Sequence, residues 1–246
     1  MKNITTLILS VLVGMSSFLL LSNLMSLGFH QPASVSVIDE GLDGEIRVCP
    51  PDVIYDDVRY AVEEWNKAIT YFGLRYVWPD VLSKRLRVSS DGCDVRFEFV
   101  EFRELKAGCK NVGDLMAVSV TSFDGDGATI HIWKGLVGQD IKDVLRRVLI
   151  HEFSWVLGIH PPITVVETAA SPTGSLKVTS LDIYALHARS MVDFDGRKVV
   201  NVDVPQNIPF ITVERGLAYD CLIALASAFI SLLSYKILKV VEEWPT

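Results

Sequence analysis

The sequence predicts an α+β fold, in which a domain of strands and amphipathic helices is flanked by two transmembrane helices. Three observations predict it. Long uncharged runs lie near both ends of the chain, at residues 4–29 and 222–235. Short segments between them alternate polar and apolar residues, which is typical of half-buried strands. Two further segments repeat apolar residues every three or four positions and predict amphipathic helices.

The first uncharged run, residues 4–29, is preceded only by the charge of Lys2. It exceeds the roughly 20 residues that cross a bilayer and the roughly 7–15 residues of a signal-peptide core. We interpret residues 1–29 as an uncleaved signal anchor, with a removed signal peptide as the alternative. Residues 30–44 contain Pro, Ala, Ser and Gly with little periodicity, and we expect a linker there.

The second run carries apolar residues on every face, and Lys236 and Lys239 follow it. Long lysine side chains can extend to the headgroups, so we predict a transmembrane helix over residues 216–241 and a tail over 242–246. A surface or core amphipathic helix is the alternative. Because lysines flank the outer end of each run, we expect a cell-membrane protein with both termini cytoplasmic and the main domain extracytoplasmic.

The net charge indicates which partners to expect, and the cysteines bear on whether the main domain lies in an oxidising compartment. The net charge is −7 and no basic stripe is present, so we expect no nucleic-acid partner. Three cysteines, Cys49, Cys93 and Cys109, would lie in an oxidising compartment, where disulfides persist. Cys93 and Cys109 are the nearest pair, but the odd count leaves the pairing open, and Cys221 lies at the membrane.

The main domain is predicted over residues 45–189. A short strand is followed by an amphipathic helix, which spans Val58 to Phe72 and which Gly73 closes. Further strands follow, and a loop at residues 123–127 is interpreted as a hairpin turn, with a calcium site as the alternative. The predicted strands span residues 45–49, 74–78, 95–99, 115–120 and 128–133.

The site helix opens near residues 139–140 and carries the pair His151–Glu152. A zinc peptidase helix places His, Glu and a second His at i, i+1 and i+4. This spacing sets two imidazoles on one face, with the carboxylate beside them to take a proton from metal-bound water. Gly158 would end the helix, and the chain would then turn back with a third ligand.

This stretch resembles the metzincin signature H-E-x-x-H-x-x-G-x-x-H, and within that clan the matrixin-like zinc metallopeptidases. The resemblance makes His151 a metal ligand, Glu152 the catalytic base and Gly158 the turn glycine. Trp155 stands where the second His belongs, and His160, matched to the third ligand, comes one residue early. The loop at 161–178 also lacks the methionine of the family's Met-turn.

The resemblance implies a mixed sheet backed by one helix, an edge strand above the cleft, and then the site helix. We expect the strand at 128–133 to lie at that edge, and Trp155 to share a helix face with His151. A capped helix over residues 179–187 would close the domain. Residues 190–215 would form a β-hairpin that spaces the domain from the bilayer.

Two functions follow from the resemblance. In the first, a degenerate relative binds an extended peptide or a protein partner in its cleft, holds zinc weakly or not at all, and does not cleave efficiently. In the second, the chain is an active membrane-tethered zinc endopeptidase with an unconventional third ligand. His131, His187 and Glu167 are candidates for that ligand, although none has metal-ligand spacing to His151. We favour the first.

Overall fold

The computed structural model describes residues 2–26, 34–108, 118–125, 127–137, 142–160, 177–208 and 210–243. The chain divides into two compact units. One joins Met1–Gln31 with Pro205–Thr246, and the other spans Pro32–Val204.

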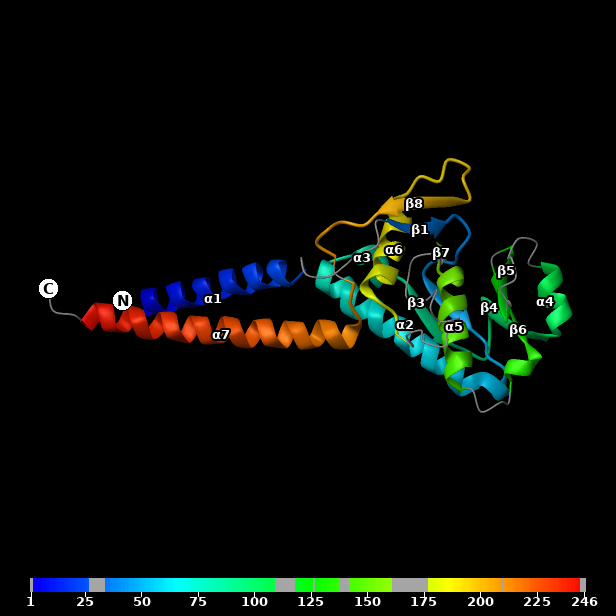
Figure 1. Cartoon of the computed structure of the whole chain (residues 1–246), viewed down its shortest axis with the longest axis horizontal. Coiled ribbons are helices and arrows are strands. Elements are labelled where there is room, and N and C mark those ends of the chain that lie inside the picture. Colours follow the sequence, from blue (N-terminus) through cyan, green and yellow to red (C-terminus); the bar gives the residue numbers. More distant parts are fainter. Residues whose placement is uncertain are drawn as a thin grey trace. The chain divides into compact units, whose positions relative to one another are not determined.

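The larger unit is built on a five-stranded mixed sheet, as predicted (Figure 1). Its strands, in spatial order, are β3 (Arg85–Val88), β2 (Glu45–Val48), β4 (Val95–Val100), β6 (Gly127–Trp133) and β5 (Ser119–Asp124). All neighbours are parallel except β5 and β6, which form an antiparallel hairpin. The two edge strands are therefore β3 and β5, and the prediction that residues 128–133 form an edge is wrong. β6 lies inside the sheet because β4 pairs with it along its other side.

Two amphipathic helices supply the core on one face of this sheet. They are α2 (Tyr55–Tyr76) and α5 (Lys142–Val156). Trp65 of α2 is fully buried, and its indole N–H donates to the carbonyl oxygen of Ile150 at 3.0 Å, which fixes α5 against α2. Four short helical segments complete the connections: η1 (Asp52–Ile54), α3 (Pro79–Leu82), α4 (Phe102–Gly108) and η2 (Lys134–Leu136).

Helix α2 does not end at Gly73, contrary to prediction. Gly73 is buried, and a Cβ there would come within 2.7 Å of the Leu82 side chain, so glycine serves close packing at this position. The helix ends three residues later at Tyr76, and the next residue, Val77, has φ of 58° and ψ of 51°, in the left-handed region. The residues predicted as a strand at 74–78 are therefore mostly the last turn of this helix.

A second, three-stranded antiparallel sheet lies in the same unit. Its order is β7 (Ile159–His160), β1 (Ser34–Ile38) and β8 (Val199–Asp203), and α6 (Ser180–Met191) packs against it. Strand β1 falls inside the predicted linker, and β8 pairs with β1 instead of forming the predicted hairpin. A turn does form at Asp195–Gly196, where both residues have positive φ. The capped helix is confirmed, since Thr179 and Asp182 form a capping box at its N-terminus.

A disulfide joins Cys49, directly after β2, to Cys93, just before β4. The open question of cysteine pairing is thus answered by a bridge between neighbouring parallel strands, and its two cysteines lie 44 residues apart in sequence. Cys109 lies outside the described residues.

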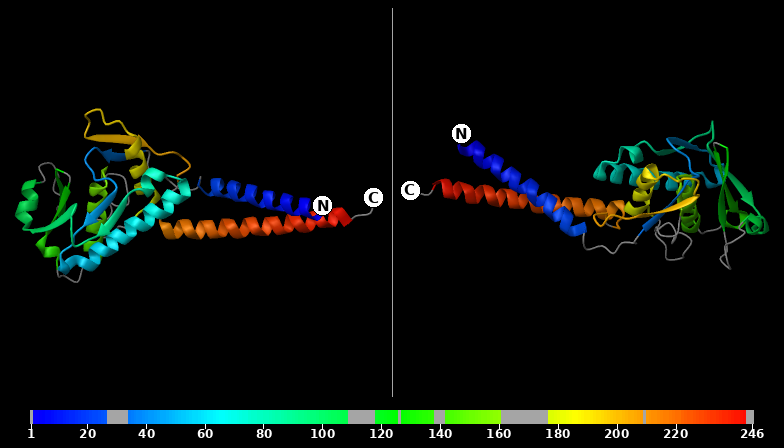
Figure 2. Two further views of the ribbon diagram at one scale, coloured as in Figure 1. Left: turned by 180° about the vertical axis from the view of Figure 1, so that it is seen from behind. Right: turned by 90° about the horizontal axis from the view of Figure 1, so that it is seen from above.

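The smaller unit is a pair of antiparallel helices, α1 (Lys2–Ser26) and α7 (Val213–Glu243), with both chain termini at the same end (Figures 1 and 2). Ser231 donates its hydroxyl to the carbonyl of Ser10 at 2.7 Å, and a Cβ on Gly14 would lie 3.0 Å from Ser231. Small side chains let the two backbones approach closely. Among the residues that the structure describes, the helix over Val213–Val240 is long and apolar enough to cross a membrane, and a further apolar helical stretch spans Thr6–Phe18.

Candidate functional site

Helix α5 carries the three central residues of the predicted site within two turns. The indole N–H of Trp155 donates to Nε2 of His151 across 3.3 Å, one helical turn away. Trp155 therefore shares a face with His151, as predicted. Nε2 of His151 is the acceptor of this bond. The lone pair that could bind a metal through Nε2 is directed at the indole instead.

Glu152 lies beneath the edge strand. Its side chain is buried, with 2% exposure, and each carboxylate oxygen accepts a hydroxyl: Ser119 Oγ at 2.5 Å and Thr121 Oγ1 at 2.5 Å. Such charge-assisted bonds offset the cost of burying a carboxylate. The carboxylate is thus held by the protein's own hydroxyls.

Strand alternation places these hydroxyls. Side chains two positions apart point to the same face of a strand, so Ser119 and Thr121 both face α5. They pair with Ile132 and Ile130 of β6, which are fully buried on that face. The predicted strand at 115–120 stopped before Thr121, and neither hydroxyl was singled out from the sequence. The Ser-x-Thr spacing beside a predicted edge strand is the signal that could have found them.

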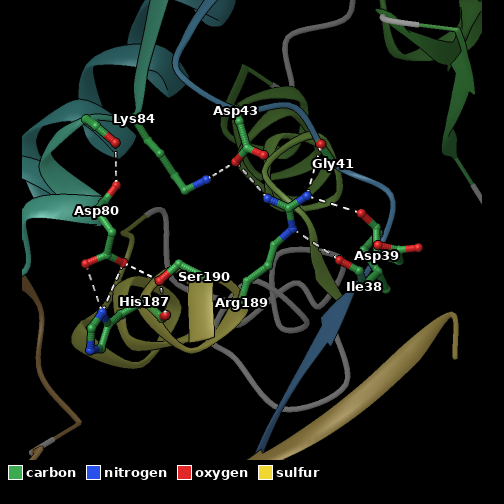
Figure 3. A network of polar contacts seen from close by, with 10 residues as sticks. Ile38, Asp39, Gly41, Asp43, Asp80, Lys84, His187, Arg189 and Ser190 are labelled. Atoms are coloured by element: carbon green, nitrogen blue, oxygen red, sulfur yellow. Dashed lines mark hydrogen bonds and ion pairs between the residues drawn. The ribbon is translucent and has the colours of Figure 1, made fainter. Parts of the chain in front are cut away.

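Gly158 forms the predicted turn after α5, with φ of +80°. A Cβ at this position would lie 2.2 Å from Nε of Arg189, so the guanidinium occupies the space above the glycine. Arg189 donates to the carbonyl oxygens of Ile38, Asp39 and Gly41 at 3.1–3.2 Å (Figure 3). This side chain from α6 therefore fixes both the turn after the site helix and the chain after β1.

Two carboxylates complete the polar network of Figure 3. Burial tends to raise the pKa of Asp43, but its ion pairs with Lys84 and Arg189 hold that pKa below the usual value. Burial likewise acts to raise the pKa of Asp80, and hydrogen bonds from Ser190 and His187 lower it overall. Both carboxylates are thus stabilised as anions.

The remaining candidate metal ligands either contact other residues than His151 or have side chains outside the described part of the chain. His131 contacts Glu98 at 3.2 Å and Ser122 at 2.9 Å, on the sheet face opposite to the buried isoleucines. His187 contacts Asp80 at 3.0 Å and stacks on Trp78. In β7, the backbone of His160 pairs with Ser36 of β1, and the side chain of His160 lies outside the described part of the chain, as does Glu167.

The described residues do not fit the catalytic zinc ion that the resemblance implies. A zinc ligand must offer a lone pair, whereas Trp155 offers an N–H and directs it at His151 Nε2. The carboxylate of Glu152 is already engaged by Ser119 and Thr121. Within the described ranges, no three His, Cys, Asp or Glu side chains group closely enough to hold a metal ion.

Comparisons of the chain with models of protein families, with curated proteins and with solved structures find no match.

Proposed function

We propose that this chain is a membrane-anchored, extracytoplasmic relative of the metzincin peptidases that binds extended peptides and does not cleave them. The observation that carries the proposal is the closed arrangement on α5. Trp155 caps the ligand nitrogen of His151, and two hydroxyls occupy the carboxylate of Glu152. A bound water would need both groups for activation, and both have protein partners.

The order of elements supports the family tie. A mixed sheet, a backing helix (α2), an antiparallel edge strand (β5) and then the helix with His151 follow one another as the resemblance implies. Glu152 faces the edge strand, and Gly158 turns the chain at the end of the helix. This order of elements supports a relative of the family, and the engaged side chains on α5 support a site without catalysis.

Membrane anchoring is supported by α7, which is long and apolar enough to span a bilayer. The helix α7 packs antiparallel to α1, so the start of α1 and the end of α7 lie at the same end of the pair, which supports the topology that we propose from the lysines. The disulfide between Cys49 and Cys93 favours an oxidising compartment for the larger unit. We therefore place that unit on the extracytoplasmic side.

The edge strand β5 supports peptide binding. Trp133 donates its backbone N–H to Val118, so Val118 is a hydrogen-bonded position of the antiparallel ladder. Such positions alternate, which turns the backbone groups of Ser119, Thr121 and Phe123 away from β6. No described strand pairs with this outer edge. An extended peptide can add there as a further strand, held by main-chain hydrogen bonds.

The test uses the full chain in lipid nanodiscs, presented to a display library of unstructured heptapeptides. We expect peptides to bind without being cut. Phe123→Pro removes one outward N–H, and Phe123→Ala removes the same ring but keeps that N–H. Loss of one hydrogen bond of about 1 kcal/mol should weaken binding about fivefold in the proline variant relative to the alanine variant. Equal affinity of the two variants, or cleavage of the bound peptides, would refute the proposal.

A further inference from the structure

The C-terminal end of α2 exposes apolar side chains. We name residues 74–78 the α2 tip. Leu74 is 63% exposed and Val77 is 79% exposed. Val77 adopts left-handed backbone angles, which β-branched residues rarely do and which glycine or asparagine normally supplies at a helix end. A strained and exposed valine indicates that the side chain at this position serves a contact outside the unit.

The neighbours of Val77 are aromatic and cationic. The rings of Tyr76 and Trp78 stack with centroids 4.7 Å apart. Arg75 donates to the hydroxyl of Tyr71 at 2.9 Å, and its guanidinium lies about 6 Å from that ring. Aliphatic side chains flanked by Tyr, Trp and Arg are the combination found at the boundary between lipid headgroups and acyl chains.

The tip lies beside the place where the chain leaves the larger unit. Trp78 lies 6.0 Å from the ring of Tyr184, centroid to centroid, and the Tyr184 hydroxyl donates to the carbonyl of Asp203 at 2.8 Å. Asp203 is the last residue of β8, and it pairs with Ser34, the first residue of β1. The segments toward α1 and α7 thus start from the same point of this unit, next to the tip.

The lengths of those segments limit how far this point can lie from the helices. Residues 27–33 separate α1 from β1, and residues 204–212 separate β8 from α7. At about 3.5 Å per residue, the first can span at most about 30 Å and the second about 35 Å. These lengths keep the point from which both segments start within about 30 Å of α1 and about 35 Å of α7, so the tip beside that point can reach a bilayer that α7 spans.

We propose that the α2 tip rests in the headgroup region of the bilayer, with Leu74 and Val77 inserted toward the acyl chains, and so fixes the orientation of the extracytoplasmic unit. This inference rests on the membrane anchoring proposed above. The ligand is a phospholipid surface; a protein partner at the same tip is a distinguishable outcome of the test.

The experiment places a nitroxide at Val77→Cys in the full chain, in a Cys109→Ser, Cys221→Ser background, reconstituted in phosphatidylcholine–phosphatidylglycerol nanodiscs. Val53→Cys is the matched control, because Val53 is an equally apolar residue, 59% exposed, just before the other end of α2. That helix has 22 residues and is about 33 Å long. Leu225→Cys, 69% exposed on α7, reports the anchor itself.

Collision of each label with oxygen, which partitions into lipid, is compared with collision with a water-soluble nickel chelate. We expect high oxygen and low nickel accessibility at positions 77 and 225, and the reverse at 53. An aqueous label at 77 beside a lipid-exposed label at 225 overturns this inference and leaves the anchor standing. A label at 77 protected from both reagents indicates a protein partner and also overturns it. An aqueous label at 225 refutes the anchor.

A second measurement needs no substitution. Photolysis of a diazirine phospholipid in nanodiscs that hold the unmodified chain should attach lipid to the peptide containing Leu74 and Val77. The peptide containing Val53 should stay unlabelled. Equal labelling of the two peptides, or none on the first while α7 is labelled, contradicts the inference.

Discussion

Replacing Gly158 by alanine tests the contact that fixes the end of the site helix. The residue has φ of +80°, where an L side chain is strained. The new Cβ would also lie 2.2 Å from Nε and 2.5 Å from Cδ of Arg189, so the guanidinium would have to move. Glycine is therefore needed here for two separate reasons, backbone conformation and space.

The two reasons have separate magnitudes. Left-handed backbone costs a non-glycine residue about 1–2 kcal/mol. Displacing Arg189 breaks at least one of its hydrogen bonds to Ile38, Gly41 and Asp43, and each bond to a charged group contributes about 1.5–3 kcal/mol. We expect Gly158→Ala to lower the free energy of unfolding by about 2.5–5 kcal/mol in total.

A double-mutant cycle separates the two contributions. In an Arg189→Ala background only the backbone cost remains, so Gly158→Ala should then cost about 1–2 kcal/mol. The assay is guanidinium denaturation of the full chain in detergent micelles, followed by the fluorescence of its tryptophans, one of which is the fully buried Trp65. If the two substitutions were additive within about 0.5 kcal/mol, Arg189 would not constrain this turn and the reasoning would be refuted.

Three further outcomes are expected. Val77→Gly should raise the free energy of unfolding in detergent by about 1 kcal/mol, because it removes left-handed strain from an exposed valine; unchanged or lower stability in denaturation would contradict this. Replacing Cys49 and Cys93 by alanine should lower it by about 4 kcal/mol, from a bridge between residues 44 apart, and a loss under about 1 kcal/mol would count against the bridge. The hydrogen bond from the Arg47 side chain lowers the pKa of Asp94, so the ionised Asp94 contributes stability above about pH 4 and loses that contribution as pH falls further. Below pH 4, the denaturation midpoint of Asp94→Asn should therefore fall less steeply with pH than that of the unmodified chain. Parallel curves would contradict the assignment.

Apolar periodicity was sufficient to predict the two amphipathic helices α2 and α5, but not the short helices α3 and α4. The spacing that runs from Val58 to Phe72 predicts α2, although Gly73 was taken as its end, since a glycine kept for close packing looks the same in sequence as a glycine that caps a helix. The position of Trp155 beside His151 also followed from sequence, because residues four apart on a helix share a face.

The pairings between segments far apart in the chain could not be predicted from local sequence patterns. Strand β1 is only five residues long, and its partner β8 lies more than 160 positions away, so nothing local distinguishes Ser34–Ile38 from a linker. The same holds for the disulfide, where sequence separation favoured Cys93 with Cys109 and the parallel strands bring Cys49 to Cys93 instead. The hydroxyls on Glu152 depend on which strand forms the edge, which local periodicity does not determine.

Zinc content measured on the full chain tests the central claim most directly. The unmodified chain and Trp155→His are purified in detergent, equilibrated with zinc, dialysed and analysed for metal, and each is assayed for peptide hydrolysis with and without Glu152→Ala. We predict well below one zinc per unmodified chain, a measurable gain in Trp155→His as the imidazole pair at i and i+4 is restored, and no hydrolysis that depends on Glu152 in the unmodified chain. One zinc per unmodified chain, with hydrolysis that Glu152→Ala abolishes, would contradict the account and identify an active peptidase.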